Sequence, residues 1–334
     1  MENQSIGQLL KWGKSELRET NLRSPDLDAE VLLMEVLDVE RLVLHVYPER
    51  VVEPTQLKAY QDWIRRRQAE EPLHYITGKK EFMGLNFHVE KGVLIPRGDT
   101  EVVVEAAIKT LKEIGKKRGF KAMDKTPGTE AAEENASQRE ELRALDIGVG
   151  SGAIAVSLLY YVKNLYMVGT DISTIPLKVT EINAKNHGVD HRLELLQGSL
   201  FEPLNRVGAA DKNFKASDKN FEDSGRVFET PDSAFDLIIS NPPYISFDVK
   251  EDLDREVKDY EPEEALFARE QGLYYYREIA GQAPFYLKKN GVLIFEIGYD
   301  QGDGVRRIVQ QAGFKGVQIL KDLENRDRVV IGKR

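Results

Sequence analysis

Residues 142–154 read LRALDIGVGSGAI and combine a strand, a tight turn and the start of a helix. The run LRALDI is largely apolar, as expected of a strand buried in a parallel sheet. Gly148, Gly150 and Gly152 follow it directly. Glycine lets the backbone turn tightly and approach a ligand closely, and the start of the next helix offers free N–H groups. The stretch therefore predicts a βα unit with a loop that can hold a ligand.

Strands and helices alternate from this stretch towards the C-terminus. Further strands are predicted in YMVGTDIS (166–173), LELLQGSLF (193–201), FDLIIS (235–240) and GVLIFEIG (291–298). Helices are predicted from Ala153, from about Pro176, and from about 272 to 289. The last residues, GVQILKDLENRDRVVIGKR (316–334), are predicted to form a closing hairpin. This order predicts an α/β domain with a mostly parallel sheet covered by helices.

The rest of the chain divides into three further kinds of segment. Apolar residues recur three and four positions apart in the first part, which predicts a small helical domain over 1–73. Short β-prone pieces separated by glycines predict a β-hairpin linker over 74–98, and the α/β domain then occupies 99–334. Two hydrophilic stretches, 115–140 and 205–233, have few periodic apolar positions and are expected to be surface insertions.

Composition restricts the function. The chain has 334 residues, a formal net charge of -9, 41% hydrophobic residues and no cysteine. These values indicate a folded protein without disulfides, thiolate metal sites or a cysteine nucleophile, which suits a cytoplasmic location. The acidic balance disfavours binding to nucleic acid through many phosphates. No apolar run approaches the length of a membrane span, so neither a signal peptide nor an anchor is expected.

Asp171 is the second clue to a ligand. It stands nineteen residues after Gly152, at the end of the next predicted strand. That spacing fits an acid that accepts hydrogen bonds from ribose hydroxyls, although a role in capping the following helix is the alternative. A nucleoside-bearing cofactor is therefore expected. Both NAD and S-adenosylmethionine remain open at this point, but the pattern G-x-G-x-G departs from the dinucleotide spacing G-x-G-x-x-G.

The stretch SNPPYIS (240–246) follows the apolar run FDLII. Proline cannot donate to a sheet ladder, so Asn241 and Pro242 must lie where the strand has ended. In an open α/β sheet, ligands bind at this end of the strands. The combination resembles class I methyltransferases that modify a planar nitrogen, in which the Asn side chain and a proline carbonyl accept hydrogen bonds from an NH₂ group. The alternative is a stiff turn without chemistry.

The matching motifs extend over nearly the whole chain. They are EPLHYITGKKEF (71–82), LIPRGDTE (94–101), ALDIGVGSGAIA (144–155), GTDIS (169–173), ISNPPYI (239–245), YEPEEAL (260–266) and RVVIGKR (328–334). With these motifs the sequence resembles the bacterial release factor glutamine methyltransferases, the PrmC or HemK family. The resemblance implies a class I, Rossmann-like fold with a seven-stranded, mostly parallel sheet and a C-terminal antiparallel hairpin. It also implies S-adenosylmethionine as cofactor and N5 methylation of the glutamine in the Gly-Gly-Gln loop of class I peptide chain release factors.

The resemblance also implies roles for individual residues. The cofactor would be held by Gly148, Val149, Gly150, Ser151, Gly152, Asp171, Leu200 and Asn241. The substrate glutamine would be held by Asn241, Pro242, Pro243 and Tyr244, with Asn241, Pro242 and Tyr244 as the catalytic set. Tyr244 would form a wall beside the planar amide. No metal is expected. The helical domain is implied to dock the release factor, and a monomer is expected.

Two positions depart from the family pattern, and other functions remain open. Gly98 stands where the family usually has proline, and Ser199 stands where an acid is common. The alternatives are a glutamine methyltransferase of a ribosomal protein, which would share the active site, and an adenine-N6 methyltransferase of nucleic acid. A binding module that has lost its activity would be expected to have a damaged glycine loop or NPPY, and both are intact. Glu296 is expected to be a buried, hydrogen-bonded acid or to line the site.

Overall fold

A computed structural model describes residues 4–119, 141–208 and 234–334 of the chain. The described residues within 1–80, 89–91 and 251–261 form one compact unit, and the described residues within 81–88, 92–250 and 262–334 form another. The predicted insertions 115–140 and 205–233 lie largely outside the described residues. Where they are described, their ends are helical, because one helix continues to Lys117 and another covers residues 202–208.

The first unit is a helical bundle. It contains α1 (Ile6–Arg18), α2 (Pro25–Leu37), α3 (Arg41–Val46), α4 (Pro54–Gln68) and α5 (Leu73–Thr77). Ser5 caps α1 with a capping box that also uses Gln8, and Pro25 occupies the first turn of α2, where its missing N–H is not needed. Apolar side chains from α1, α2 and α4 pack into one core around Tyr60. The helical nature predicted for this part of the chain is confirmed.

The first unit also contains a segment that a linear division of the sequence did not predict. Residues 251–261, with the short helix α10 (Arg255–Lys258), belong to it although they follow the NPPY motif. Arg67 explains why, because its guanidinium bonds Asp28 at 2.7 Å and Glu256 at 2.8 Å. Arg67 is 4% exposed, and a buried charge requires such partners.

The second unit is built on a seven-stranded sheet of order β10-β11-β9-β6-β3-β4-β5. The strands are β3 (Leu142–Ile147), β4 (Leu165–Asp171), β5 (Leu193–Gln197), β6 (Phe235–Ser240), β9 (Leu287–Glu296), β10 (Lys315–Lys321) and β11 (Asp327–Lys333). Neighbours from β5 to β9 pair in parallel, and β11 pairs antiparallel with both β9 and β10. The predicted α/β class and the closing hairpin are therefore confirmed.

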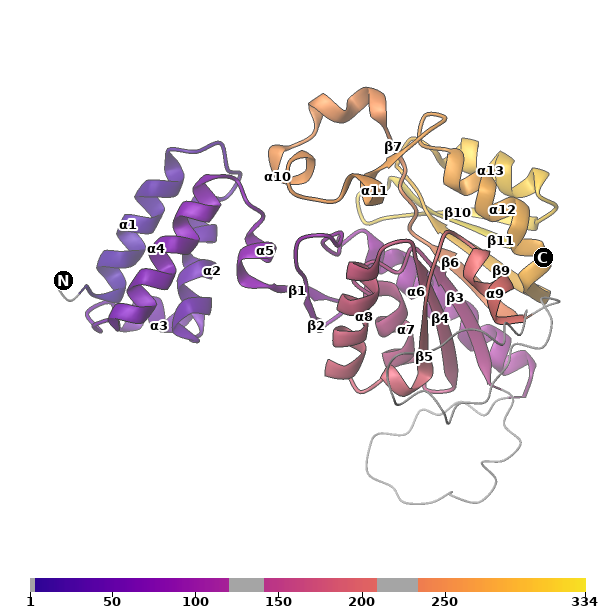
Figure 1. Cartoon of the computed structure of the whole chain (residues 1–334), viewed down its shortest axis with the longest axis horizontal. Coiled ribbons are helices and arrows are strands. Elements are labelled where there is room, and N and C mark those ends of the chain that lie inside the picture. Colours follow the sequence, from indigo (N-terminus) through magenta and orange to yellow (C-terminus); the bar gives the residue numbers. More distant parts are fainter. Residues whose placement is uncertain (1–3, 120–140, 209–233) are drawn as a thin grey trace, which may run out of the picture. The chain divides into compact units, whose positions relative to one another are not determined.

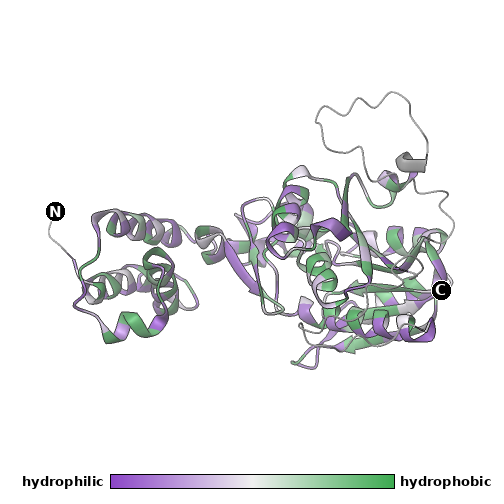
Figure 2. Cartoon of the chain, turned by 90° about the horizontal axis from the view of Figure 1, so that it is seen from below, coloured by the Kyte–Doolittle hydropathy of each residue, from purple (hydrophilic) through white to green (hydrophobic). Residues whose placement is uncertain are grey.

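Helices cover both faces of this sheet (Figure 1). One face carries α6 (Thr100–Lys117), α7 (Ala153–Tyr161) and α8 (Thr174–Asn186), and the other carries α9 (Glu202–Gly208), α12 (Tyr274–Tyr286) and α13 (Gly302–Gln311). Every residue of β6 is buried, and β3 is nearly as buried, because both strands have helices above and below. Figure 2 accordingly colours the central strands largely as hydrophobic.

The remaining elements are short, and some of them include residues of both units. The strands β1 (Lys79–Phe82) and β2 (Leu85–His88) form the predicted hairpin, and β7 (Ile245–Ser246) pairs with β8 (Phe267–Ala268). The remaining pieces are η2 (Asp190–Arg192), η3 (Phe247–Asp252) and α11 (Glu263–Leu266). Within the described ranges, no helix combines the length and the apolar character needed to cross a bilayer.

Candidate active site

The strand order brings the two sequence motifs together. Strand β3 has β4 on one side and β6 on the other, so the chain changes direction across the sheet at this point. Ile147 and Ser240 are partners in the β3–β6 ladder, and the Ser240 hydroxyl donates to the Ile147 carbonyl at 2.6 Å. The glycine loop after β3 and the NPPY loop after β6 therefore start side by side. Such a switch point is where open α/β sheets bind ligands.

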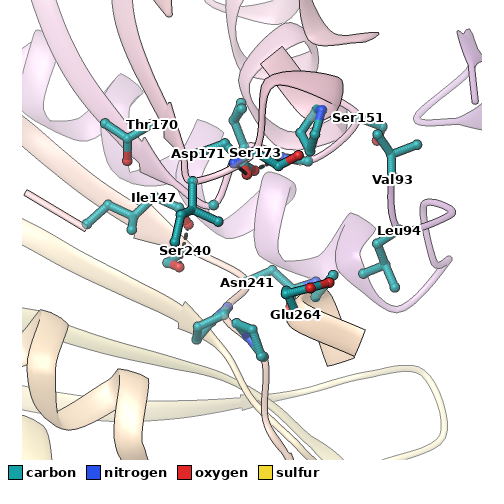
Figure 3. A pocket seen from close by; sticks show the side chains of 18 of the residues that line it. Val93, Leu94, Ile147, Ser151, Thr170, Asp171, Ser173, Ser240, Asn241 and Glu264 are labelled. Atoms are coloured by element: carbon teal, nitrogen blue, oxygen red, sulfur yellow. Dashed lines mark hydrogen bonds between the residues drawn. The ribbon is translucent and has the colours of Figure 1, made fainter. Parts of the chain in front are cut away.

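A cavity of about 600 Å³ lies at this edge of the sheet. Its volume falls in the range typical of small-molecule sites. The predicted site residues that line it are Gly148, Val149, Gly150, Ser151, Asp171, Leu200, Asn241, Pro242 and Pro243. Figure 3 shows residues from separate strand ends arranged around this pocket, with Asp171 at the end of β4, Ser173 just beyond it, and Asn241 after β6.

The glycine loop has the backbone that the sequence predicts. Gly148 and Gly150 have φ values of 77° and 58°, a region in which side chains are disfavoured. The N–H groups of Gly148 and Val149 donate to the Thr170 carbonyl at 2.8 and 3.0 Å, which holds the loop against the end of β4. No atom lies within 4 Å of the position a Cβ of Gly148 would take. The space beside this glycine is therefore open to a ligand.

Gly152 has different surroundings from Gly148 and Gly150. It does not line the cavity, and it caps α7 with φ 80°. A Cβ at Gly152 would lie 2.8 Å from Thr180 Cγ2 of α8. The positive φ and the close packing of α7 against α8 both favour glycine at this position, and a contact of Gly152 with the cofactor stays a prediction.

Asp171 shapes the loop as well as facing the cavity. Its Oδ2 accepts from the Gly150 N–H at 3.1 Å and its Oδ1 accepts from the Ser173 N–H at 3.0 Å. Burial raises the pKa of Asp171, while the backbone donors of Ser173 and Gly150 oppose that rise. Each carboxylate oxygen has lone pairs left for a further donor, so the carboxylate can bind a ligand hydroxyl as well. The alternative role at the start of α8 is also realised, but by Ser173, whose hydroxyl accepts from Ile175.

Asp146 lies directly beneath the loop, in β3. It is 1% exposed, and burial raises its pKa well above the usual range of an aspartate, with the charge of Asp171 adding to the rise. Burial and the neighbouring carboxylate of Asp171 thus both disfavour the charged form of Asp146.

The NPPY loop presents Asn241 to the cavity. Asn241 and Pro243 are half-buried, and Pro242 is buried. No hydrogen bond to another described residue holds the side-chain amide of Asn241, so its oxygen is available to a ligand. Tyr244 is not among the residues that line the cavity. Its side chain packs on the core of the second unit, and its backbone carbonyl accepts from Gln301. A wall formed by Tyr244 beside the substrate amide stays a prediction.

Leu200 lines the cavity with an unusual backbone. Its φ is 52°, which is uncommon for a leucine, and the Thr170 hydroxyl donates to its carbonyl at 3.2 Å. The neighbouring Ser199, which stands where the family has an acid, lines the same cavity. Gly98 does not line it, and no atom lies within 4 Å of the position its Cβ would take.

Sequence reasoning missed several charged and polar residues of the site. Arg97 and Thr100 come from the segment LIPRGDTE, and Glu264 comes from YEPEEAL, and all three line the cavity. Figure 3 shows Glu264 and Asn241 on the same side of the pocket. Both segments carry the family resemblance, and that signal could have marked them as site segments, but nothing local to their sequence shows that they meet the NPPY loop.

Glu296 lies behind the cavity wall. It is 1% exposed, does not line the cavity, and shares a hydrogen bond with Thr100, which does. Burial raises the pKa of Glu296 to about 7, while Thr100 and Arg328 oppose the rise. The structure therefore agrees with the first of the two sequence-based interpretations, a buried and hydrogen-bonded acid.

The chain is similar in sequence to known methyltransferases over nearly its whole length. The family profile described as the PrmC N-terminal domain matches residues 8–78. A release factor glutamine methyltransferase of Clostridium acetobutylicum is 35% identical over 321 residues, which cover 96% of this chain and 95% of that protein. A bifunctional methyltransferase of Rickettsia bellii is 32% identical over 329 residues, and the chain spans 54% of its length.

A solved structure of a relative is also similar to this chain. It is the release factor-specific protein-(glutamine-N5) methyltransferase of Alicyclobacillus acidocaldarius, with 24% sequence identity and a TM-score of 0.36. The similarity covers 74% of this chain and 99% of that one.

Proposed function

The chain belongs to the release factor glutamine methyltransferase family, and we propose that it methylates class I peptide chain release factors. The methyl group leaves the sulfur of S-adenosylmethionine for the side-chain amide nitrogen, N5, of the glutamine in the Gly-Gly-Gln loop, and the nitrogen loses one of its two protons to solvent, so the products are a secondary amide and a neutral thioether. The observation that carries this proposal is the meeting of the glycine loop and the NPPY loop at one cavity, with Asn241 free to bind a ligand.

The residues of the cavity fit the cofactor. A nucleoside with an amino-acid tail needs a close approach to the backbone, and the glycine loop with its open space at Gly148 offers that approach. Asp171 has the lone pairs to accept ribose hydroxyls, and Leu200 supplies an apolar contact for a base. Val149, Gly150 and Ser151 would hold the methionine end. Gly152 supports the loop from behind by packing on Thr180.

The cofactor, when bound, supplies a sulfonium methyl group that is already activated towards a nucleophile. The protein must then overcome the weak nucleophilicity of an amide nitrogen, whose lone pair is delocalised into the carbonyl. Asn241 Oδ1 and the Pro242 carbonyl accept hydrogen bonds from the two N–H groups of the substrate amide. These two hydrogen bonds orient the nitrogen towards the methyl group. The same two acceptors stabilise the positive charge that develops on nitrogen in the transition state.

Placement supplies most of the acceleration in this mechanism. Holding two reactants in a near-attack geometry is worth roughly 7–11 kcal/mol. The two prolines serve this purpose because each has a fixed φ. Little conformational entropy is therefore lost when the Pro242 carbonyl is held in one direction. Pro243 continues the wall beside Pro242. Thr100, at the start of α6, fills the adjacent part of the cavity wall.

The remaining properties follow from the same proposal. The helical first unit docks the release factor, as its match to the PrmC N-terminal domain supports. The net charge of -9 and the absence of cysteine support a cytoplasmic protein that does not bind nucleic acid directly. We propose that the protein acts as a monomer.

Mass spectrometry of the modified substrate tests the proposal. The full chain is incubated with a class I release factor and S-adenosylmethionine carrying a labelled methyl group, and the release factor is digested and sequenced by tandem mass spectrometry. A single labelled methyl on the glutamine of Gly-Gly-Gln is the expected result. Label on a ribosomal protein or on adenine in a parallel lysate, with none on the release factor, would overturn the substrate and keep the chemistry of the NPPY loop.

A further inference from the structure

Both ends of the Gln301 side-chain amide are bonded within the protein. Its Nε2 donates to the Tyr244 carbonyl at 3.0 Å and to the Gln271 carbonyl at 3.4 Å. Its Oε1 accepts from the Gly298 N–H at 3.1 Å. The Tyr276 hydroxyl lies 3.3 Å from the same oxygen, but its single hydrogen is shared with the Glu296 carbonyl at 3.0 Å. Both donors of the amide and one acceptor position are therefore satisfied. This fixes the rotamer and the orientation of the amide.

The Tyr244 carbonyl is confined from a second side by Gly272. Gly272 has φ 85°, and a Cβ at this position would lie 2.0 Å from the Tyr244 oxygen and 2.5 Å from Gln301 Nε2. Only a residue without a side chain can therefore occupy this position beside the Tyr244 carbonyl. Gln301 and Gly272 together hold the last residue of the NPPY motif.

The first end of the motif is held as well. Ser240 is in the ladder with Ile147, and its hydroxyl donates to the Ile147 carbonyl. Beyond Tyr244, the chain pairs at once through Ile245 with Phe267. Only Asn241, Pro242 and Pro243 lie between the two anchors, and these three residues line the cavity.

We propose that Gln301 is a positioning residue for methyl transfer, which it serves by fixing the carboxyl-terminal end of the NPPY loop. This inference rests on the proposed function. Gln301 does not line the cavity, so its effect passes through Tyr244 to the Pro242 carbonyl and Asn241. A displacement of about 1 Å in a reacting group can cost on the order of 100-fold in rate. Gln301 therefore controls catalysis without contact to either reactant.

Gln301→Glu tests this role with little change in shape. One carboxylate oxygen can still accept from the Gly298 N–H, whereas the other replaces the NH₂ group and faces the carbonyl oxygens of Tyr244 and Gln271. Repulsion between oxygens then displaces the loop. Gln301→Met removes the donor without adding a charge. Gln310→Glu, an exposed position on the same helix, is the matched control.

The measurements separate positioning from general loss of structure. For each variant that melts as a folded protein, we expect kcat on intact release factor to fall at least 30-fold, while the Kd for S-adenosylmethionine stays within threefold and Gln310→Glu resembles wild type. Hydrogen exchange measured on peptides spanning 240–246 is expected to be faster in both Gln301 variants.

Three results would overturn the inference. The first is kcat within threefold of wild type in folded Gln301→Glu and Gln301→Met. The second is a loss of kcat matched by an equal loss of cofactor affinity, which would make Gln301 a general structural residue. The third is unchanged exchange in 240–246. The exchange measurement needs no turnover. If the wild-type protein fails to methylate the release factor, the proposed function is refuted, and hydrogen exchange in 240–246 still tests whether Gln301 holds the NPPY loop.

Discussion

At the scale of single residues, Asn241 combines exposure to the cavity with an amide that no other described residue binds. An amide that faces a cavity and has no partner within the protein can exchange bound water for the polar groups of a ligand. Together with the rigid proline pair beside it, this availability favours Asn241 as a ligand-binding group. The residue's own backbone, by contrast, is fixed by Ser240 on one side and Pro242 on the other.

Asn241→Ala is expected to lower kcat for release factor methylation by about 100- to 1,000-fold. The reason is the loss of one acceptor to a charge that develops in the transition state, for which single groups are worth roughly 2.7–4 kcal/mol. The Kd for S-adenosylmethionine, measured by titration calorimetry, is expected to change only a few-fold. Near-normal turnover would show that Asn241 does not bind the reacting amide.

Asp171→Ala is expected to weaken cofactor binding instead. Loss of the ribose acceptor should raise the Kd for S-adenosylmethionine by about 10- to 100-fold, which corresponds to about 1.4–2.8 kcal/mol. Asp171→Asn should lie between wild type and Asp171→Ala, since it keeps one acceptor oxygen. Asp190→Ala, an exposed acid in η2, is the control. An unchanged Kd for Asp171→Ala would contradict the assignment to ribose.

Glu296 gives a prediction about pH. Its pKa is raised from 4.5 to about 7 in the folded protein, chiefly by burial. Between these values the folded state holds a proton that the unfolded state releases, so this group lowers the free energy of unfolding as the pH rises from about 4.5 to 7. At about 1.4 kcal/mol per pKa unit, the full cost above pH 7 is on the order of 3 kcal/mol.

Glu296→Gln should therefore gain stability relative to wild type as the pH rises. We expect the difference in unfolding free energy between variant and wild type, from urea titrations, to increase by roughly 2–3 kcal/mol between pH 5 and pH 8. Glu105→Gln, at an exposed position on α6, should show no such change. A difference that does not vary with pH would mean that Glu296 is ionised in the fold throughout this range.

At the scale of elements, the glycine loop and the helix after it have separate requirements. Gly148 and Gly150 allow the turn of the loop beside the cavity, whereas Gly152 allows α7 to lie against α8. The sequence pattern does not distinguish the three glycines, because it does not show which residues lie beside each of them in the folded protein. Only the packing of Thr180 on Gly152 separates the two roles.

Gly152→Ala is expected to destabilise the fold by about 1–3 kcal/mol, since the new methyl group overlaps with Thr180 at an unfavourable φ. Thermal unfolding measures this directly. Thr180→Ser in the same chain should recover part of the loss by removing Cγ2. Gly281→Ala, in α12 with no atom within 4 Å of the added Cβ, is the control and should be neutral or slightly stabilising. Equal effects at Gly152 and Gly281 would contradict the packing argument.

The pattern of strands and helices was predictable at this scale. Runs such as FDLIIS and LRALDI are short, apolar and bounded by glycine or proline, and β6 and β3 occupy them closely. Helix ends were less predictable. Helix α6 continues to Lys117, into a stretch expected to be an insertion, because charged residues are compatible with an exposed helix face as well as with a loop.

At the scale of the whole molecule, the chain passes between the two units more than once. It leaves the second unit after Lys250, contributes residues 251–261 to the helical unit, and returns at Pro262. In the helical unit this segment is held by Arg67 through Glu256 and by the Tyr260 hydroxyl, which donates to the Ala69 carbonyl at 2.7 Å. Removal of the first 70 residues would take away the partners of Glu256 and Tyr260 and so disturb residues 251–261 as well. Point substitutions therefore test docking more specifically.

Exposed apolar side chains of the helical unit offer such substitutions. Leu42, in α3, is 68% exposed, and Tyr47, which directly follows α3, is 53% exposed. Burial of such groups against a partner contributes to affinity. We expect Leu42→Ser with Tyr47→Ser to raise the KM for intact release factor about 3- to 10-fold and to leave the KM for a short Gly-Gly-Gln peptide unchanged.

The control for docking is Leu323→Ser, an exposed residue in the turn between β10 and β11 of the second unit. It should affect neither substrate. Equal effects of the Leu42 and Tyr47 substitutions on protein and peptide would argue against a docking function for this face.

The sequence by itself determined what contiguous residues encode. Alternating runs predict the α/β sheet, glycines after a strand predict the loop, and Asp171 and NPPY mark two further strand ends, since backbone preferences act over a few neighbours. Only the tertiary structure decided what depends on distant pairs. It packed Tyr244 on the core, packed Gly152 against Thr180, paired Arg67 with Glu256, and bonded Gln301 to the Tyr244 carbonyl, 57 positions earlier in the chain. Such contacts are selected by packing and by the need to satisfy buried polar groups, and no local pattern records them.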